Sequence, residues 1–246
     1  VKGDCNEVRK HRVKITRPFW LSKVAVTEAQ WRKILYGEVQ GGKENPRYDF
    51  ASQNSSRRRK QQFMDALNKV FSHDRPKGYV FRLPTEAELS YAMTSGGRDR
   101  ITETSIGMYG PALADKEKIC AELTAKGVKL KNAESVRALK VGMARPNTWG
   151  FYDVINNGEP FVLDRIAPNS KMRKLKLDEK DNLLNISYAD VETDPLCWED
   201  EENAVYLRCD QSVFWMRHAC GDYGWIETFR VCLGPDLIAE KKAKGK

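Results

Sequence analysis

The chain has 246 residues, of which 41% are hydrophobic and 31% are charged, and its formal net charge is +8. This composition is typical of a folded globular protein, and the length suffices for a core without disulfide or metal support, so a wholly disordered chain is excluded. No stretch approaches the roughly 18 apolar residues of a membrane-spanning helix, and we expect no membrane span. The six cysteines form no CxxC pair, which argues against a zinc site and favours unpaired thiols.

Two short strands are expected within residues 11–26. Val13 and Ile15 alternate with polar neighbours, a pattern typical of a half-buried strand. Pro18 interrupts this pattern, and Phe19–Val26 predicts a second short strand.

A helix is expected directly after these strands. Thr27 is a suitable N-cap, and Gln30 completes a capping box with it. Gly37 is able to end the helix in a left-handed conformation. Three residues share the apolar face of this helix: Trp31, Ile34 and Leu35.

Two further helices are expected after a polar loop at residues 38–56. The first spans about residues 57–72 and carries apolar residues at helical spacing. The second begins at Thr85, where Glu88 completes another capping box, and ends at Gly96-Gly97. The apolar stripe of the first helix consists of Phe63, Ala66, Leu67 and Val70.

The remainder of the chain consists of short apolar pieces between Gly, Pro, Asn and Asp residues. This pattern predicts loops and short strands, including Ala204–Leu207 and Phe229–Leu233. No internal repeat or low-complexity linker is visible, so we expect a single domain over residues 1–246.

Two basic runs stand out against this background. One is Arg57 to Lys60, and the other is formed by Lys241, Lys242, Lys244 and Lys246. We interpret them as a solvated helix face and a frayed basic tail at about 239–246. The alternative is a patch that binds phosphates, but no aromatic residues interleave with either run, so we expect no nucleic-acid partner.

Three blocks resemble, in order, segments of the formylglycine-generating-enzyme (sulfatase-modifying factor) family. Val24–Trp31 resembles the family's strand-to-helix junction, and Arg82–Glu88 reads RLPTEAE as the family does. Residues 141–153 match the family pattern VG…PN.WGLYD, and Phe229–Val231 resembles its closing GFRV strand.

The resemblance covers about residues 11–233 and implies an α+β, C-type-lectin-like fold with short irregular strands, few helices and long loops. Within it, Arg82 is expected to form an ionic network with Glu86 and Glu88. Three residues of the blocks are expected to be largely buried: Leu83, Trp149 and Phe229.

The resemblance also implies where catalysis would take place. Family enzymes oxidise a substrate cysteine with copper held by two cysteines that lie five residues apart after an RGGS strand. Here that strand corresponds to Arg208–Ser212, and Phe214 and Ala219 stand at the two thiol positions. Cys209 and Cys220 lie nearby but eleven positions apart and out of register, so we expect no copper site and no catalytic residue.

Other cofactors are not expected either. In the family's calcium-binding GNVWEW segment, Asn157 is retained but Pro160 replaces the glutamate that would supply a ligand, which leaves calcium as the one alternative to no cofactor. The three histidines, His11, His73 and His218, are far apart in sequence and form no predicted metal cluster.

The segment at about 209–227 mixes aromatic and short polar residues as binding surfaces do. Loss of the thiol pair with retention of the scaffold resembles the variable proteins of diversity-generating retroelements, which carry a hypervariable ligand-binding surface at this position. The scaffold would then comprise about 11–208 and 228–233. The expected ligand-binding residues are Asp210, Ser212, Val213, Phe214, Trp215, His218, Cys220, Asp222, Tyr223, Trp225 and Ile226.

Retroelement diversification, as the resemblance implies it, acts mainly on asparagine-type codons, which cannot yield Trp, Met, Gln or Glu. Trp215, Trp225 and Glu227 are therefore expected to be fixed, as are Gln211 and Met216, and the other ligand-binding residues to vary.

The sequence thus predicts a non-catalytic binding protein with a macromolecular partner, a protein or a cell-surface glycan, in a surface-displayed or virion-associated setting. A copper-dependent oxidase is the first alternative, and a binder of anionic surfaces or nucleic acids through the basic runs is the second.

Overall fold

The computed structural model describes part of the chain in detail. For some strand and helix-end residues only the backbone is described. The described residues are 6–7, 13–37, 51–52, 57–99, 113–127, 129, 140–154, 159–166, 192–193, 196, 205–209, 216–219 and 227–244.

The N-terminal region contributes three short strands, β1 (Asn6–Glu7), β2 (Val13–Lys14) and β3 (Trp20–Leu21). The expected alternation is confirmed, because Val13 and Ile15 are half-buried while Lys14 is exposed. The second strand is shorter than the pattern suggested and occupies only two residues of Phe19–Val26.

Helix α1 (Glu28–Tyr36) begins and ends where the sequence predicts. Thr27 accepts a hydrogen bond from the Gln30 amide, and the Gln30 side chain returns one to the Thr27 N–H, so the capping box is complete. Gly37 adopts a φ of 67° and its N–H donates to the Lys33 carbonyl, which ends the helix.

Helix α2 (Arg57–Val70) buries a face slightly different from the expected one. Phe63 and Leu67 are buried as predicted, but Val70 is 61% exposed. The buried face instead includes Lys60 and Met64, which places it at i, i+3, i+4 and i+7 and leaves the last turn of the helix outside the core. The interpretation of the whole basic run as a solvated face is therefore wrong at Lys60.

Strand β4 (Tyr79–Arg82) leads into helix α3 (Glu86–Met93), which has the predicted capping box between Thr85 and Glu88. The helix ends earlier than Gly96-Gly97, because the next two bonds depart from the α-helical pattern: the Ser95 N–H donates to the Ala92 carbonyl and the Gly96 N–H to the Tyr91 carbonyl. The following left-handed turn includes Ser95, a non-glycine residue with φ 49°.

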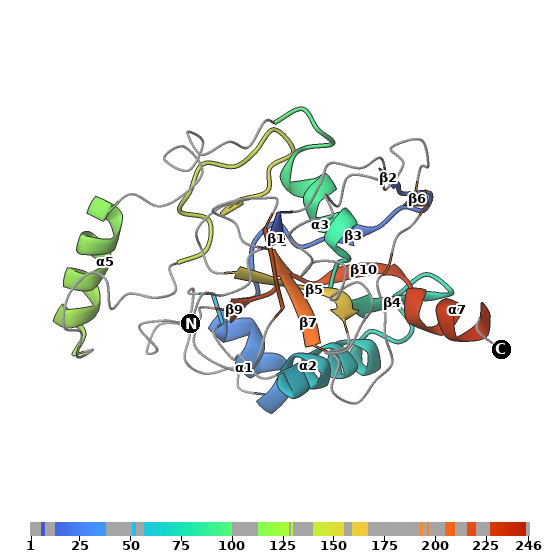
Figure 1. Cartoon of the computed structure of the whole chain (residues 1–246). Helices are drawn as coiled ribbons and strands as arrows, with labels where there is room; N and C mark the ends of the chain where they lie inside the picture. The colour runs from blue at the N-terminus through green and yellow to red at the C-terminus, as the bar shows by residue number, and fades with distance from the viewer. Residues whose placement is uncertain are drawn as a thin grey trace.

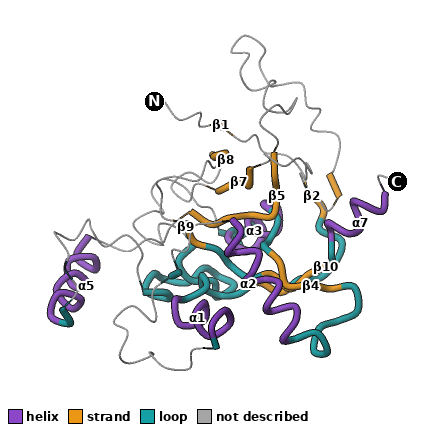
Figure 2. The backbone as a smooth tube through the Cα atoms, turned by 90° about the horizontal axis from the view of Figure 1, so that it is seen from below, coloured by secondary structure: helices purple, strands orange, loops and turns teal. Residues whose placement is uncertain are grey.

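Several elements after residue 112 were not anticipated. These are α5 (Leu113–Ala125), the eight-residue strand β5 (Glu159–Ile166), β6 (Glu192–Thr193) and α7 (Leu237–Lys244). The basic tail is thus helical as far as Lys244 and not frayed. Helix α5 lies at the periphery in both views (Figures 1 and 2).

The remaining strands are β7 (Val205–Cys209), β8 (Met216–Ala219), β9 (Glu227–Thr228) and β10 (Cys232–Pro235). The expected strand at Phe229–Leu233 therefore begins three residues later than the sequence suggested. The described strands form a five-stranded sheet in the order β1-β8-β7-β5-β9, a three-stranded sheet in the order β3-β10-β4, and the pair β2-β6.

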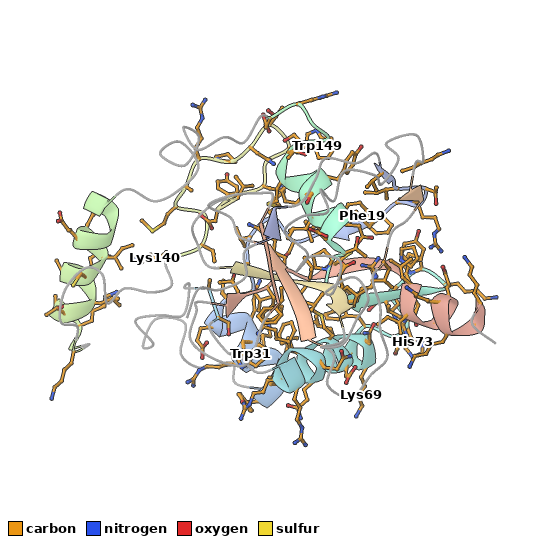
Figure 3. The ribbon with its side chains drawn as sticks, in the orientation of Figure 1. Phe19, Trp31, Lys69, His73, Lys140 and Trp149 are labelled. Atoms are coloured by element: carbon orange, nitrogen blue, oxygen red, sulfur yellow. The ribbon has the colours of Figure 1, made fainter. Side chains whose placement is uncertain are left out.

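The main core lies where α1 and α2 pack beneath these sheets, around Trp31 (Figure 3). Its indole stacks on Phe63 at 5.3 Å between ring centroids, and the edge of Phe229 meets both rings at 5.7 and 5.5 Å. Aromatic residues from the N-terminal helices and from the C-terminal strand region thus share one cluster, which connects the two ends of the described chain.

Candidate ligand-binding site

The expected recognition segment is bounded by two strands that pair with the same neighbour. Strand β7 pairs antiparallel with β5, where Arg208 lies opposite Phe161. Strand β9 pairs parallel with the first residues of β5, where Glu227 lies opposite Glu159. Residues 209 and 227 therefore flank the same end of β5, about 10 Å apart for two strand spacings.

Most of the expected ligand-binding residues lie outside the described part of the chain. For His218 the backbone is described, and it lies in β8 opposite Arg208 of β7. The other ten are Asp210, Ser212, Val213, Phe214, Trp215, Cys220, Asp222, Tyr223, Trp225 and Ile226. Their exposure and clustering stay predictions.

The chain that leaves the segment is buried at once. Thr228, Phe229 and Arg230 are at most 2% exposed. The Val26 N–H donates to the Phe229 carbonyl at 2.9 Å. The three residues that follow the segment all lie in the core, so the C-terminal end of the segment has a fixed position.

Arg230 fixes this exit through backbone carbonyls. Its guanidinium donates to the carbonyls of Lys23 at 2.6 Å and Tyr152 at 2.5 Å, and more weakly to those of Ser22 and Asp153. Complete burial lowers the pKa of Arg230 to about 10, against the raising effect of the Asp153 carboxylate. One side chain thereby joins three separate stretches of the scaffold.

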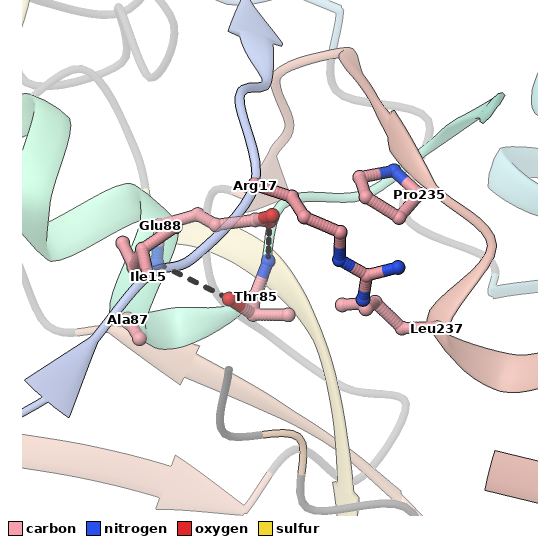
Figure 4. Close-up of a pocket in the computed structure, with 7 residues that line it drawn as sticks. All are labelled: Ile15, Arg17, Thr85, Ala87, Glu88, Pro235 and Leu237. Atoms are coloured by element: carbon pink, nitrogen blue, oxygen red, sulfur yellow. Dashed lines mark hydrogen bonds between the residues drawn. The ribbon is translucent and has the colours of Figure 1, made fainter. Parts of the chain in front are cut away.

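The RLPTEAE block forms the expected buried ionic contact, with Glu88 as the acidic partner. Both carboxylate oxygens of Glu88 accept hydrogen bonds from Arg82 at 2.7 Å. One of them also accepts from the Thr85 N–H at 2.8 Å, and Figure 4 shows this bond. Burial lowers the pKa of Arg82, but the hydrogen bond to Glu88 and the neighbouring negative charges outweigh this effect, so the pKa is raised and the guanidinium stays charged. The expected contribution of Glu86 is different: its backbone N–H donates to Asp164 at 2.8 Å.

The turn at residues 146–150 is held by Asn147. Its amide nitrogen donates to the carbonyls of Ala92 and Met93 at the end of α3, and its amide oxygen accepts from the N–H groups of Trp149 and Phe151. All these bonds lie between 2.8 and 3.1 Å. The turn is therefore a scaffold element, as its Pro-Asn sequence suggested.

The expectation of a largely buried Trp149 is wrong. Leu83 and Phe229 are buried as predicted, but Trp149 is 38% exposed at the surface (Figure 3). Its indole packs edge-on against Tyr91 at 5.1 Å, and a Cβ on Gly96 would come within 2.9 Å of the ring. Trp149 thus packs on the outer side of the turn after α3. The sequence pattern alone does not distinguish such a partly exposed indole from a buried one.

The described residues do not form the family's metal sites. Among them, no group of three or more His, Cys, Asp or Glu side chains is placed to hold a metal ion. At the described thiol position of the family register, Ala219 of β8 offers no ligand atom. In the calcium segment, Phe161 is buried in the core and Pro160 pairs with Thr228. The residues present therefore do not fit the family's copper pair.

Of the two cysteine side chains that the structure describes, Cys232 is too deeply buried to act as a replacement nucleophile. Cys120 and Cys232 are free thiols, and Cys232 is fully buried. Burial raises the pKa of Cys232 far above its ordinary value, with a smaller opposing effect from Arg82.

No helix within the described ranges is long and apolar enough to cross a bilayer.

Three solved structures are similar in fold to this chain. Treponema denticola variable protein 1 has a TM-score of 0.58 at 14% identity, over 95% of this chain and 92% of that one. PvdO from Pseudomonas aeruginosa has a TM-score of 0.54 at 14% identity, over 94% and 90%. CarF has a TM-score of 0.53 at 13% identity, over 95% and 97%. No curated protein matches the sequence.

A family model completes the comparison. The model of the sulfatase-modifying factor enzyme 1-like domain matches residues 2–186, well over half of the chain. Together with the capped helices, the Arg82–Glu88 pair and the Asn147 turn, this match establishes that the chain belongs to the sulfatase-modifying factor enzyme 1-like family and has its C-type-lectin-like α+β fold.

Proposed function

We propose that the protein is a non-catalytic binding protein whose recognition surface is formed by residues 209–227. The observation that carries this proposal is the pairing of both flanking strands, β7 and β9, with one end of β5. A segment held in this way begins and ends on the same sheet. Binding residues frequently lie on connecting segments that a fixed scaffold positions.

The similarity in fold to a variable protein supports the same reading. The partner we propose is a macromolecule, a protein or a cell-surface glycan, met at the surface of a cell or virion. Arg230 and Phe229 would keep the scaffold constant while the segment changes, because neither lies within it.

A copper-dependent oxidase is the competing function, since the chain belongs to the family named after sulfatase-modifying factor enzyme 1. Such an enzyme needs two converging thiolates. Of the two positions where the family places them, Ala219 has no sulfur and Phe214 has none either. Oxidase activity would require Cys209 and Cys220 to converge instead.

A paired-library experiment tests the proposed function. One display library replaces the codons of five candidate positions, Asp210, Phe214, His218, Asp222 and Tyr223, with asparagine-derived codon mixtures. A matched library does the same at five exposed positions of α2: Arg58, Arg59, Gln62, Asp65 and Lys69. Both are assayed for trypsin resistance and for binding to hen egg-white lysozyme as a model target.

We expect most members of both libraries to resist trypsin, and binders to be enriched from the segment library alone. Unfolding of most segment-library members would show that the segment is core. For the unmodified protein, stoichiometric copper(I) binding lost in Cys209→Ser or Cys220→Ser, with oxidation of a sulfatase-type cysteine peptide, would establish the oxidase instead.

A further inference from the structure

The three-stranded sheet β3-β10-β4 carries two aromatic side chains that meet at the surface. Trp20 of β3 and Tyr79 of β4 come from the two strands that flank β10 (Figure 1). Their ring centroids are 5.9 Å apart, and the ring planes meet at 64°. We call these two residues the Trp20–Tyr79 pair. It lies outside residues 209–227, so the inference does not depend on the proposed function.

Trp20 is the exposed member of the pair. Its side chain is 54% exposed, although tryptophan is a residue that folding usually buries to a large extent. Within the described part of the chain, no acceptor lies at its indole N–H. An exposed aromatic ring with an unused donor is typical of residues that dominate binding surfaces.

Tyr79 is held in place by its neighbours. Its hydroxyl donates to the carbonyl of Pro18 at 3.2 Å, and its N–H donates to the carbonyl of Pro76 at 3.0 Å. Its carbonyl accepts from the guanidinium of Arg75. The orientation of the Tyr79 ring is therefore fixed before a ligand arrives, which reduces the entropy lost on binding. Both prolines are exposed and extend the apolar surface next to the pair.

The side chains at the pair supply hydrogen-bond donors. These are the indole N–H of Trp20 and the guanidinium of Arg75. A sugar needs acceptors as well as donors around its hydroxyl groups. A run of prolines has carbonyl oxygens and no N–H groups, so it needs donors alone. Such a run also adopts the extended polyproline II helix without cost, and this helix docks on surfaces lined with aromatic residues.

The acidic side chains nearest the pair are engaged by the protein. The N–H of Asp236 donates to the Gly78 carbonyl next to Tyr79, and its carboxylate accepts from the Ala239 N–H at 3.0 Å. Glu240 accepts from Arg17 with both carboxylate oxygens, at 2.5 and 2.9 Å. These two carboxylates are therefore occupied within the fold.

The turn that leads into β4 carries a net positive charge. Lys77 is exposed and makes no ion pair with a described residue. Arg75 adds a second positive charge, and the exposed Asp74 offsets one of the two. A partner with an acidic residue beside its prolines would complement this turn, although a surface pair of this kind contributes only modestly to affinity.

We propose that the Trp20–Tyr79 pair binds a proline-rich segment of a partner protein. One proline ring packs against the two aromatic rings, a peptide carbonyl accepts from the Trp20 indole N–H, and an acidic residue beside the prolines lies near Lys77. No bond is made or broken, so the site is one of binding only.

Titration of the full-length protein with an oligoproline peptide preceded by two glutamates, followed by calorimetry and NMR, tests this proposal. We expect saturable one-to-one binding that shifts the indole N–H resonance of Trp20 and leaves that of Trp149 in place. Trp149 is an internal control, since it also pairs with an exposed tyrosine, Tyr91, but packs against Gly96. A glycine-serine peptide with the same two glutamates should not bind, and the same prolines after two lysines should bind more weakly.

Two pairs of variants provide the matched comparisons. Trp20→Ala should weaken binding about tenfold, and Tyr36→Ala, which removes a 52% exposed aromatic residue of α1, should leave it unchanged. Lys77→Glu should reverse the preference between the two charged peptides, and Lys126→Glu, after the peripheral helix α5, should not.

The Lys77 comparison does not depend on the stability of Trp20→Ala, because Lys77 is an exposed residue of a turn. Absence of oligoproline binding, equal binding of the glycine-serine peptide, or equal effects within both pairs of variants would overturn the proposal. Trp20-dependent binding of a heparin fragment in place of the oligoproline would overturn it as well and would identify the pair as a glycan site.

Discussion

Replacing Glu88 with alanine tests whether the RLPTEAE block stabilises the fold through its buried ion pair. Glu88 receives two hydrogen bonds of 2.7 Å from Arg82, and the two side chains are only 7% and 5% exposed. Removal of the carboxylate leaves the Arg82 guanidinium charged and without its ionic partner. It also removes the acceptor for the Thr85 N–H at the start of α3.

The expected cost follows from these two losses. Breaking a buried pair by removing one partner costs about 3–5 kcal/mol. Loss of a cap alone costs about 1 kcal/mol, which is the value expected for Thr85→Ala. Glu88→Gln keeps the volume and one acceptor oxygen but loses the charge, so we expect it to fall between the two, at roughly 2 kcal/mol. The free energy of unfolding of a typical domain is only about 5–15 kcal/mol in total.

Urea denaturation of the purified variants measures these differences, with an unchanged m-value as the condition for comparing them. The expected order of destabilisation is Glu88→Ala, then Glu88→Gln, then Thr85→Ala. A cost for Glu88→Ala no larger than that of Thr85→Ala would show that the ion pair contributes nothing beyond the cap, and the reasoning would be refuted.

Two further predictions concern burial. Trp31 is fully buried and Trp149 is 38% exposed, so Trp31→Ala should cost about 3–5 kcal/mol and Trp149→Ala roughly 2 kcal/mol by urea denaturation; equal costs would contradict the assigned positions. Burial raises the pKa of Cys232, so its stabilising effect is complete below the unfolded pKa of about 8.5 and is lost as pH rises above it. Between pH 8.5 and 9.5 the free energy of unfolding should therefore fall by about 1 kcal/mol more than in Cys232→Ala; parallel pH profiles would contradict this.

The features that the sequence predicted correctly are local ones. The capping boxes at Thr27 and Thr85 and the left-handed Gly37 depend on residues no more than four positions apart. Such contacts form within one turn of helix, so spacing alone is enough to predict them. The blocks shared with the family extended this success to the overall fold.

The features that the sequence missed depend on distant contacts. Lys60 is buried because it reaches Phe161, a hundred positions away, and no local pattern indicates that. Trp149 packs against Tyr91 and Gly96, which are far from it in sequence, and is 38% exposed. The Trp20–Tyr79 pair also depends on two strands far apart in sequence, which β10 brings into one sheet.

The way residues 209–227 are anchored bears on how much sequence change they tolerate. The entropic cost of closing such a segment depends on its length, and even a doubling adds only about 0.6 kcal/mol. The pairing of β8 with β7, including His218 opposite Arg208, uses main-chain groups that every residue except proline supplies. At constant length, substitutions in the segment therefore alter neither the closure cost nor this ladder. What they alter is the side-chain surface, which is the property that a recognition segment on a constant scaffold has to change.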